Sequence, residues 1–156
     1  MTQATQSVDA EEQLVIFQLA SEVYGVDIGR VQEIIRTQHI TRVPRAPEFV
    51  EGVINLRGKV IPVVDLRKRF GLEGGEHGKA SRIVVVEAGE HTIGIVVDAV
   101  SEVLRIPTAA VEPPSPVVTT VDSDYLRGIA KLEDRLIILL DLDAVLSQEI
   151  VVASEN

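Results

Sequence analysis

The sequence contains no cysteine and no tryptophan, and only five of its 156 residues are aromatic, three Phe and two Tyr. Without cysteine there are no disulfides and no thiolate metal sites, which is compatible with a reducing compartment. Because aromatic side chains are scarce, the core has to be built from Val, Ile and Leu. The 46% apolar content excludes general disorder, and the length suits one domain or two small subdomains sharing a core.

The sequence also lacks an apolar run long enough to span a membrane, and its first residues lack the pattern of a signal peptide. We therefore expect a soluble, cytoplasmic protein that does not insert into the membrane. Residues 1–12 are expected to form a flexible N-terminal tail, and residues 147–156 a C-terminal tail or short helix.

Positive charge is in short supply, and it is unevenly distributed. The net charge is −9; residues 1–80 carry 10 basic against 11 acidic side chains, and residues 81–156 carry 5 against 13. A nucleic-acid surface needs basic groups and often aromatic stacking platforms, so nucleic acid is not expected as a partner. The difference between the two halves suggests two faces for two partners. A small β-barrel module that binds another ligand or nucleic acid is kept as the alternative.

The most informative stretch is residues 52–66, two apolar segments joined by a short turn. Its second segment, residues 60–64, is rich in β-branched side chains, which favour a largely buried strand. Pro62 cannot donate to a ladder, so we expect this strand at a sheet edge or at a bulge.

The turn of this hairpin is predicted to be of type I, with Asn55 in the first position and Gly58 in the fourth. That arrangement places Arg57 and Lys59 at the tip. Arg57 has two interpretations that the sequence leaves open. It is either a solvated turn charge of little energetic value or an Arg fork presented to a carboxylate or helix end of a partner.

Other segments are read from their periodicity. Strands are predicted over residues 13–19, 24–28, 82–87 and 92–97. Residues 29–36 have apolar side chains at helical spacing and are predicted as a short helix. Its apolar residues Val31, Ile34 and Ile35 belong either to the core or to a groove that accepts the apolar face of a partner helix. Residues 37–47 and 73–79 are predicted as an exposed connection and a linker.

The chain contains an internal repeat in two blocks. An offset of 69 aligns residues 24–36 with 93–105, and it pairs Gly25 with Gly94, Val31 with Val100, Glu33 with Glu102 and Arg36 with Arg105. An offset of 76 pairs Gly52 with Gly128, Leu56 with Leu132, Ile61 with Ile137, Asp65 with Asp141 and Leu66 with Leu142. We therefore predict two related β units that close into small barrels packed through an aliphatic interface. The alternative is a single open β-sandwich.

Chemistry is hard to find in this sequence. His39, His77 and His91 have no second ligand at metal-binding spacing, and no Gly-rich loop or nucleophile motif is present. Asp65 and Asp141 could be taken for a carboxylate pair, but we expect each to cap the turn or helix that follows its strand. No catalytic residue, metal or cofactor is predicted.

Several blocks of the sequence resemble the CheW family, the coupling proteins of bacterial chemotaxis. They are residues 24–28 with 31–34, 52–58 with 61–66, 94–98 and 125–128. The resemblance covers about residues 13–146 and implies one CheW-like domain of two SH3-like five-stranded barrels. We place these at roughly 13–72 and 82–146, and leave open an exchange of terminal strands.

The resemblance further implies a non-enzymatic adaptor that couples the cytoplasmic tip of chemoreceptors to the histidine kinase CheA, recruited to membrane-associated receptor arrays. The receptor-binding positions it implies are Val31, Glu33, Ile34, Gly52, Arg57, Val97 and Val100. A contact with the kinase regulatory domain is implied at Glu112 and Val117, in a proline-rich loop. Because the chain ends near residue 156, with no room for a receiver or kinase domain, we expect a free-standing adaptor.

Overall fold

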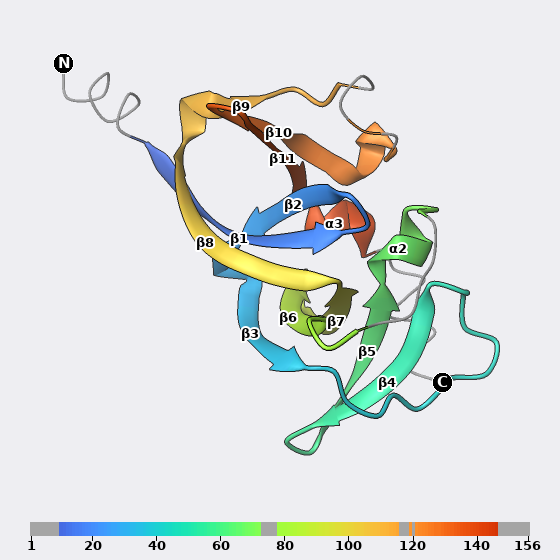
Figure 1. The fold of residues 1–156 in the computed structure, drawn as a ribbon. Helices are drawn as coiled ribbons and strands as arrows, with labels where there is room; N and C mark the ends of the chain where they lie inside the picture. The colour runs from blue at the N-terminus through green and yellow to red at the C-terminus, as the bar shows by residue number, and fades with distance from the viewer. Residues whose placement is uncertain (1–9, 73–77, 116–118, 120, 147–156) are drawn as a thin grey trace.

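The computed structural model describes residues 10–72, 78–115, 119 and 121–146, which form a mainly β structure with a few short helices, as predicted (Figure 1). Sheet A has the strand order β8 (Ala99–Pro107), β1 (Glu11–Leu19), β2 (Glu22–Asp27), β11 (Arg135–Leu140), β10 (Leu126–Leu132), β9 (Val111–Glu112). Sheet B has the order β3 (Val31–Arg36), β6 (Arg82–Ala88), β7 (His91–Val97), β5 (Lys59–Asp65), β4 (Val50–Leu56). The helical turns are η1 (Ile28–Arg30), α2 (Leu66–Arg69), η2 (Thr108–Ala110), η3 (Ser123–Tyr125) and α3 (Leu142–Val145).

The chain begins in sheet A, crosses to sheet B and then returns. Strands β1 and β2 lie in sheet A, β3 to β7 form sheet B, and β8 to β11 complete sheet A. The crossings are at η1 and at Asp98. The sheets therefore do not coincide with residues 13–72 and 82–146, because β2 pairs in parallel with β11, and β7 with β5. The short β9 gives sheet A six strands in the described part of the chain, where five were predicted.

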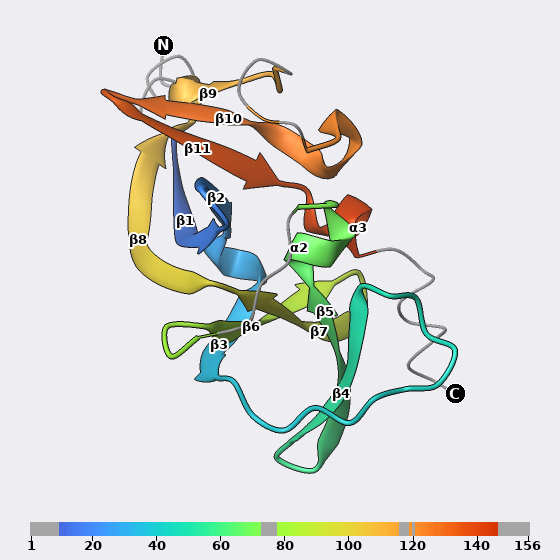
Figure 2. The same ribbon diagram turned by 45° about the vertical axis from the view of Figure 1, so that its right-hand side comes forward.

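Apolar side chains pack in three clusters. The largest draws from both sheets and includes Phe17, Tyr24, Val64 and Val97. A second cluster consists of sheet A residues and a third of sheet B residues. Figure 2 shows the two sheets as separate curved layers with α2 and α3 between them on one side. An aliphatic interface between two β units, as predicted, therefore holds the sheets together.

The internal repeat is visible in the backbone. Gly52 and Gly128 each lie at a register shift, in β4 and in β10. A Cβ on Gly52 would lie 2.1 Å from the carbonyl oxygen of Thr41, and one on Gly128 2.6 Å from that of Glu112. Asp65 accepts hydrogen bonds from the Arg67 and Lys68 amides of α2, and Asp141 from the Ala144 amide of α3. Both aspartates therefore act as helix caps, as predicted.

The helix predicted over residues 29–36 is wrong. Only Ile28–Arg30 form a helical turn, and Val31–Arg36 form strand β3. The register with β6 shifts between Val31 and Glu33. Such a bulge interrupts strict alternation, so that the spacing of the apolar residues resembles that of a helix.

The central hairpin forms, but its turn differs from the prediction. Leu56 pairs with Lys59, so the two turn residues are Arg57 and Gly58, with φ angles of 52° and 86°. Positive φ at both positions is typical of a type I′ turn, whose twist matches the flanking strands. Asn55 still caps the turn, because its Oδ1 accepts a 2.8 Å hydrogen bond from the Gly58 amide.

Pro62 lies in an interior strand, not at an edge. Strand β5 has β4 on one side and β7 on the other. Pro62 faces Val53, and the parallel ladder with β7 begins one residue later, at Val63. The proline is tolerated because it precedes the segment whose amides pair with β7.

Candidate docking site

An ion pair joins the hairpin tip to strand β3. Arg57 Nη1 donates to Glu33 Oε1 at 3.1 Å, and Nη2 contacts Oε2. The Arg57 side chain is 69% exposed and that of Glu33 27%. Because Arg57 hydrogen-bonds this carboxylate, the pKa of Glu33 is lowered and that of Arg57 raised. Two predicted site residues thus meet in a charge-assisted pair at the surface, the Glu33–Arg57 fork.

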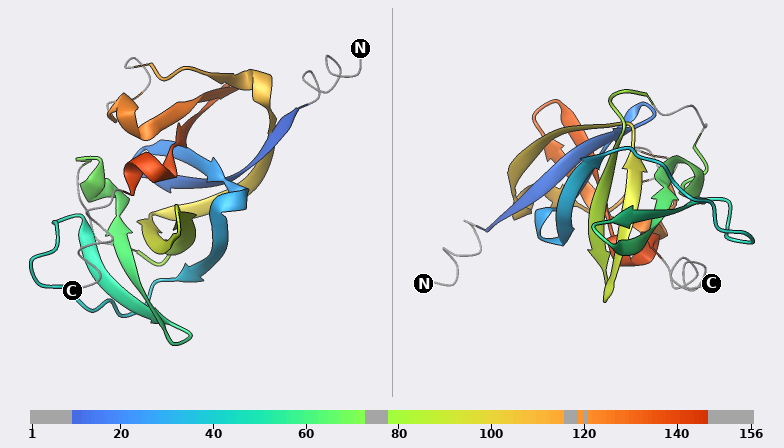
Figure 3. Two further views of the ribbon diagram at one scale, coloured as in Figure 1. Left: turned by 180° about the vertical axis from the view of Figure 1, so that it is seen from behind. Right: turned by 90° about the horizontal axis from the view of Figure 1, so that it is seen from below.

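This fork also brings together the two edges of sheet B. Strands β3 and β4 are the outermost strands in its order, yet Glu33 and Arg57 connect them. Gln38 Nε2 donates to the Asn55 carbonyl at 3.3 Å, and Thr41 forms an isolated bridge with Val53. The left view in Figure 3 shows the β4–β5 hairpin extending from the body of the molecule. The sheet is therefore closed at the base of an exposed tip.

The other predicted receptor-binding residues differ in exposure. Ile34 is 40% exposed, whereas Val97 is fully buried in the core shared by the sheets. Val31 and Val100 are partly buried and pack against the same core. Gly52 is buried beneath residues 40 and 41. Of the predicted positions, Glu33, Ile34 and Arg57 are at least partly exposed. Glu33 pairs with Val85 and Ile34 with Val84, so the two successive side chains point to opposite faces of the edge strand β3.

Sequence reasoning missed the exposed apolar residues Val60, Val103 and Leu136, which are 62%, 50% and 46% exposed. The offset of 69 places Val103 over Ile34, and the offset of 76 places Leu136 over Val60. The repeat itself is the signal that could have identified them. Each half therefore presents two exposed apolar side chains at equivalent positions of the repeat.

An ion pair accompanies the equivalent surface in sheet A. Glu102, which corresponds to Glu33, accepts a 3.0 Å hydrogen bond from Arg135 Nη2. Arg135 corresponds to Lys59, whereas Glu133 takes the place of Arg57. The hairpin tip is therefore cationic in sheet B and acidic next to Arg135 in sheet A. The two hairpins therefore occupy equivalent positions but differ in charge at their tips.

Of the two candidate kinase-contact residues, Glu112 lies in sheet A. Glu112, in the short strand β9, is exposed and forms a 3.4 Å ion pair with Lys131. Val117 lies outside the described residues.

Ion pairs occur at both crossings between the sheets. Asp98 accepts hydrogen bonds from Arg67 Nη2 at 2.5 Å and from the Ala20 amide at 2.7 Å. Asp143 accepts from Arg30 Nη2 at 2.5 Å and from the Gly89 amide at 3.2 Å. Its hydrogen bond with Arg30 lowers the pKa of Asp143. Each crossing is therefore tied to a helical turn and to the tip of a hairpin.

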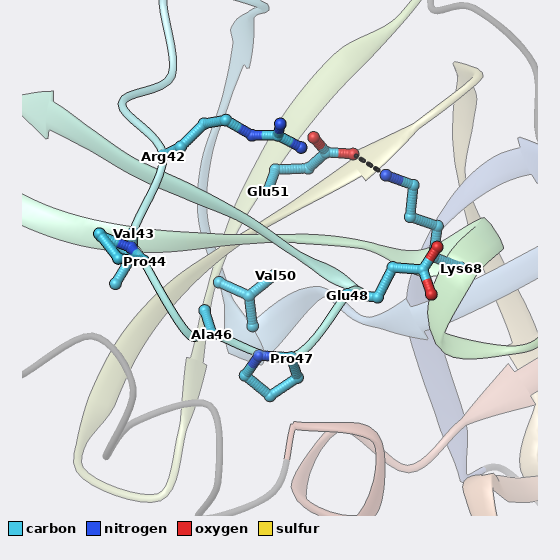
Figure 4. A pocket seen from close by; sticks show the side chains of 9 residues that line it. All are labelled: Arg42, Val43, Pro44, Ala46, Pro47, Glu48, Val50, Glu51 and Lys68. Atoms are coloured by element: carbon cyan, nitrogen blue, oxygen red, sulfur yellow. Dashed lines mark ion pairs between the residues drawn. The ribbon is translucent and has the colours of Figure 1, made fainter.

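A depression of about 410 Å³ lies beside the start of β4 (Figure 4). Lys68 and Glu51 form a 3.3 Å ion pair across it. It is lined by Arg42, Val43, Pro44, Ala46, Pro47, Glu48, Val50, Glu51 and Lys68. No residue of the candidate receptor site is among them. Positive and negative groups alternate around an apolar floor, without the convergence on one atom that a reaction centre needs.

Within the described residues, no group of three or more His, Asp or Glu side chains is placed to hold a metal ion. His77 lies outside that part, and His39 and His91 stand in separate segments. In the same part of the chain, no helix is long and apolar enough to cross a membrane.

Two curved sheets that present paired charges and exposed apolar side chains define a protein-binding scaffold. The family model described as the CheW-like domain matches residues 13–149, and the chain belongs to this family. Its role is that of an adaptor, or scaffold, of bacterial chemotaxis.

Individual relatives agree with this assignment. The chemotaxis protein CheW of Klebsiella aerogenes is 37% identical over 145 residues, covering 93% of this chain and 87% of the relative. The chemotaxis protein CheW of Bacillus subtilis is 33% identical over 146 residues, covering 93% of each. The crystal structure of the scaffolding protein TtCheW from Thermoanaerobacter tengcongensis superimposes with a TM-score of 0.82 at 46% identity, covering 88% of this chain and 89% of that one.

Proposed function

We propose that this scaffold binds the cytoplasmic helix tip of chemoreceptors through sheet B and the regulatory domain of the histidine kinase CheA through sheet A. It performs no reaction of its own and regulates the kinase by holding it next to the receptor. It acts in the cytoplasm, recruited to membrane-associated receptor arrays.

The observation that carries the proposal is the Glu33–Arg57 fork with Ile34 on the same strand as Glu33. The fork is exposed, and the Thr41–Val53 bridge joins strand β4 below the hairpin tip to the segment that follows β3. Ile34 and Glu33 point to opposite faces of β3, but β3 is an outer strand of sheet B, so an amphipathic receptor helix lying along this edge offers apolar side chains to Ile34 and polar groups to Arg57. Since the fork is already formed in the free protein, less side-chain entropy is lost on binding.

The buried members of the candidate site have a supporting role in this proposal. Val97 and Gly52 do not reach the surface, but Gly52 allows Thr41 to approach β4. Val31 and Val100 lie at the edge of the core shared by the sheets. Substitutions there would change receptor binding by displacing the surface residues.

Sheet A supplies the second docking face. Val103 in β8 and Leu136 in β11 are exposed there, and Glu112 lies in β9, which pairs with β10 at the other edge of the sheet. A regulatory domain built of similar β units would meet this face sheet to sheet. The acidic tip residues Glu133 and Asp134 would then select a partner surface that carries basic groups.

Co-purification tests the proposal. The full chain is mixed with a receptor cytoplasmic fragment, with the kinase regulatory domain, and with both. We expect a complex in each pair and a ternary complex in the full mixture. Competition between receptor and kinase for the chain would contradict two separate faces, and failure to bind either partner would refute the proposed function.

A further inference from the structure

Phe49 and Tyr125 occupy equivalent places in the two halves of the chain. The offset of 76 sets one over the other. The Phe49 carbonyl accepts a 2.8 Å hydrogen bond from the Asp65 amide, and the Tyr125 carbonyl a 2.9 Å bond from the Asp141 amide. Asp65 and Asp141 are themselves equivalent. The two rings are therefore fixed to matching points of the repeat.

Arg69 lies between these two rings. Its Cζ atom is 4.3 Å from the ring centroid of Phe49 and 5.1 Å from that of Tyr125. Its Nε donates a 3.0 Å hydrogen bond to the carbonyl of Val145. The offset of 76 makes Val145 the residue equivalent to Arg69 itself. The Arg69 side chain thus contacts the equivalent rings of Phe49 and Tyr125. It also binds the backbone of Val145, the residue that takes its own place in the second half.

The remaining aromatic residues extend this contact into sheet A. Phe70, next to Arg69, has its ring centroid 5.6 Å from that of Tyr125 and 5.8 Å from that of Tyr24. Tyr24 in turn stacks on Phe17 at 5.9 Å. The five aromatic residues of the sequence therefore form one chain of contacts, which runs from Phe17 and Tyr24 in sheet A through Phe70 and Tyr125 to Arg69 and Phe49, just before β4 of sheet B. Figure 2 shows α2, which ends with Arg69, beside α3 at this junction.

We propose that Arg69 is a positioning residue that holds sheets A and B in a single relative orientation. The core between the sheets is mostly aliphatic, and aliphatic contacts are non-directional. A planar guanidinium between two rings, with one N–H directed at a backbone carbonyl, fixes both distance and angle. The crossover ion pairs limit separation of the sheets, whereas Arg69 sets how they are rotated.

Two exposed positions report on that orientation. Val60 in sheet B and Leu136 in sheet A are equivalent and largely solvent-exposed. Because the chain has no cysteine, a Val60→Cys/Leu136→Cys variant takes spin labels at these two sites alone. Double electron–electron resonance on the folded full chain then measures the distribution of distances between the labels. We expect one narrow distribution with Arg69 present.

Three substitutions in this labelled background test the proposal. Arg69→Ala removes the guanidinium, and Arg69→Lys keeps the charge without the planar group. Arg82→Ala is the matched control, because the Arg82 guanidinium bonds only the nearby carbonyls of Lys79 and Ser81 among the interactions found in the described residues. We expect both Arg69 variants to broaden or shift the distribution and Arg82→Ala to leave it unchanged.

An unchanged distribution in both Arg69 variants would overturn the proposal. If Arg69→Ala does not fold, Arg69→Lys decides alone. No partner is present in this measurement, so its result is independent of the proposed function. If this proposal and the proposed function both hold, the Arg69 variants weaken the ternary complex more than either binary complex. The reason is that the receptor face and the kinase face are then no longer held in one relative orientation.

Discussion

Arg67 and Asp143 stand at equivalent positions in α2 and α3, yet they carry opposite charges, and each binds an opposite charge at one of the crossings between the sheets. Arg67 binds Asp98, and Asp143 binds Arg30. In both places the carboxylate also accepts a hydrogen bond from a backbone amide at a hairpin tip. Asp98 accepts from the Ala20 amide, and Asp143 from the Gly89 amide. The geometry of the repeat is preserved although acid and base have exchanged places.

Removing the Asp98 charge will measure what one crossing contributes to stability. The Arg67 and Asp98 side chains are only 19% and 21% exposed, and Asp98 binds two donors. We expect Asp98→Asn to lower the free energy of unfolding by about 1–3 kcal/mol, measured by urea denaturation. The control is Arg105→Ala, whose 3.9 Å pair with Glu11 is solvent-exposed and should matter by less than about 0.5 kcal/mol. Equal losses in the two variants would contradict this account.

A side chain at Gly52 should be far more damaging than one at Gly58. Both have positive φ, but an added Cβ at Gly52 meets the Thr41 carbonyl at 2.1 Å, whereas one at Gly58 meets nothing within 4 Å. We expect Gly52→Ala to cost more than about 2 kcal/mol and Gly58→Ala about 1 kcal/mol. Thermal and urea denaturation of both variants provide the measurement. Similar melting temperatures would show that Thr41 can move away from β4.

The Glu33–Arg57 fork should be visible in a pH titration. Because Arg57 lowers the pKa of Glu33 in the folded state, the pair adds stability above the ordinary pKa of a glutamate. That stability is lost as the pH falls through the lowered value. We expect the Glu33 carboxyl resonance to titrate below the range of exposed glutamates, and the Arg57→Ala substitution to return it to that range. A Glu33 midpoint that does not respond to Arg57→Ala would show that the fork does not persist in solution.

The repeat is what made much of the fold predictable. Aligning the two halves at offsets of 69 and 76 residues identifies the equivalent glycines and the helix-capping aspartates. This alignment needs no knowledge of which segments meet in the folded chain. Local patterns could not reveal which strands pair, because β2 and β11 are more than a hundred residues apart in the chain. The bulge after Val31 likewise produced a helical spacing in a strand.

The candidate site was only partly readable from the sequence. The fork residues Glu33 and Arg57 were identified, but nothing in their local sequence showed that they bind each other. The buried position of Val97 depends on packing between the sheets, and so does the position of Arg69 between two distant rings. Each of these features depends on contacts between segments far apart in the chain.

The most direct test of the central claim compares Arg57→Glu with Arg135→Glu for binding to a receptor cytoplasmic fragment by calorimetry. Both arginines are exposed and pair with equivalent glutamates. Arg57 lies in the hairpin turn of sheet B, whereas Arg135 lies in strand β11 of sheet A. We predict that Arg57→Glu weakens receptor binding by about tenfold or more with a nearly unchanged thermal melt, while Arg135→Glu binds the receptor like the parent chain. Unchanged receptor affinity in Arg57→Glu, or equal losses in both variants, would contradict the account.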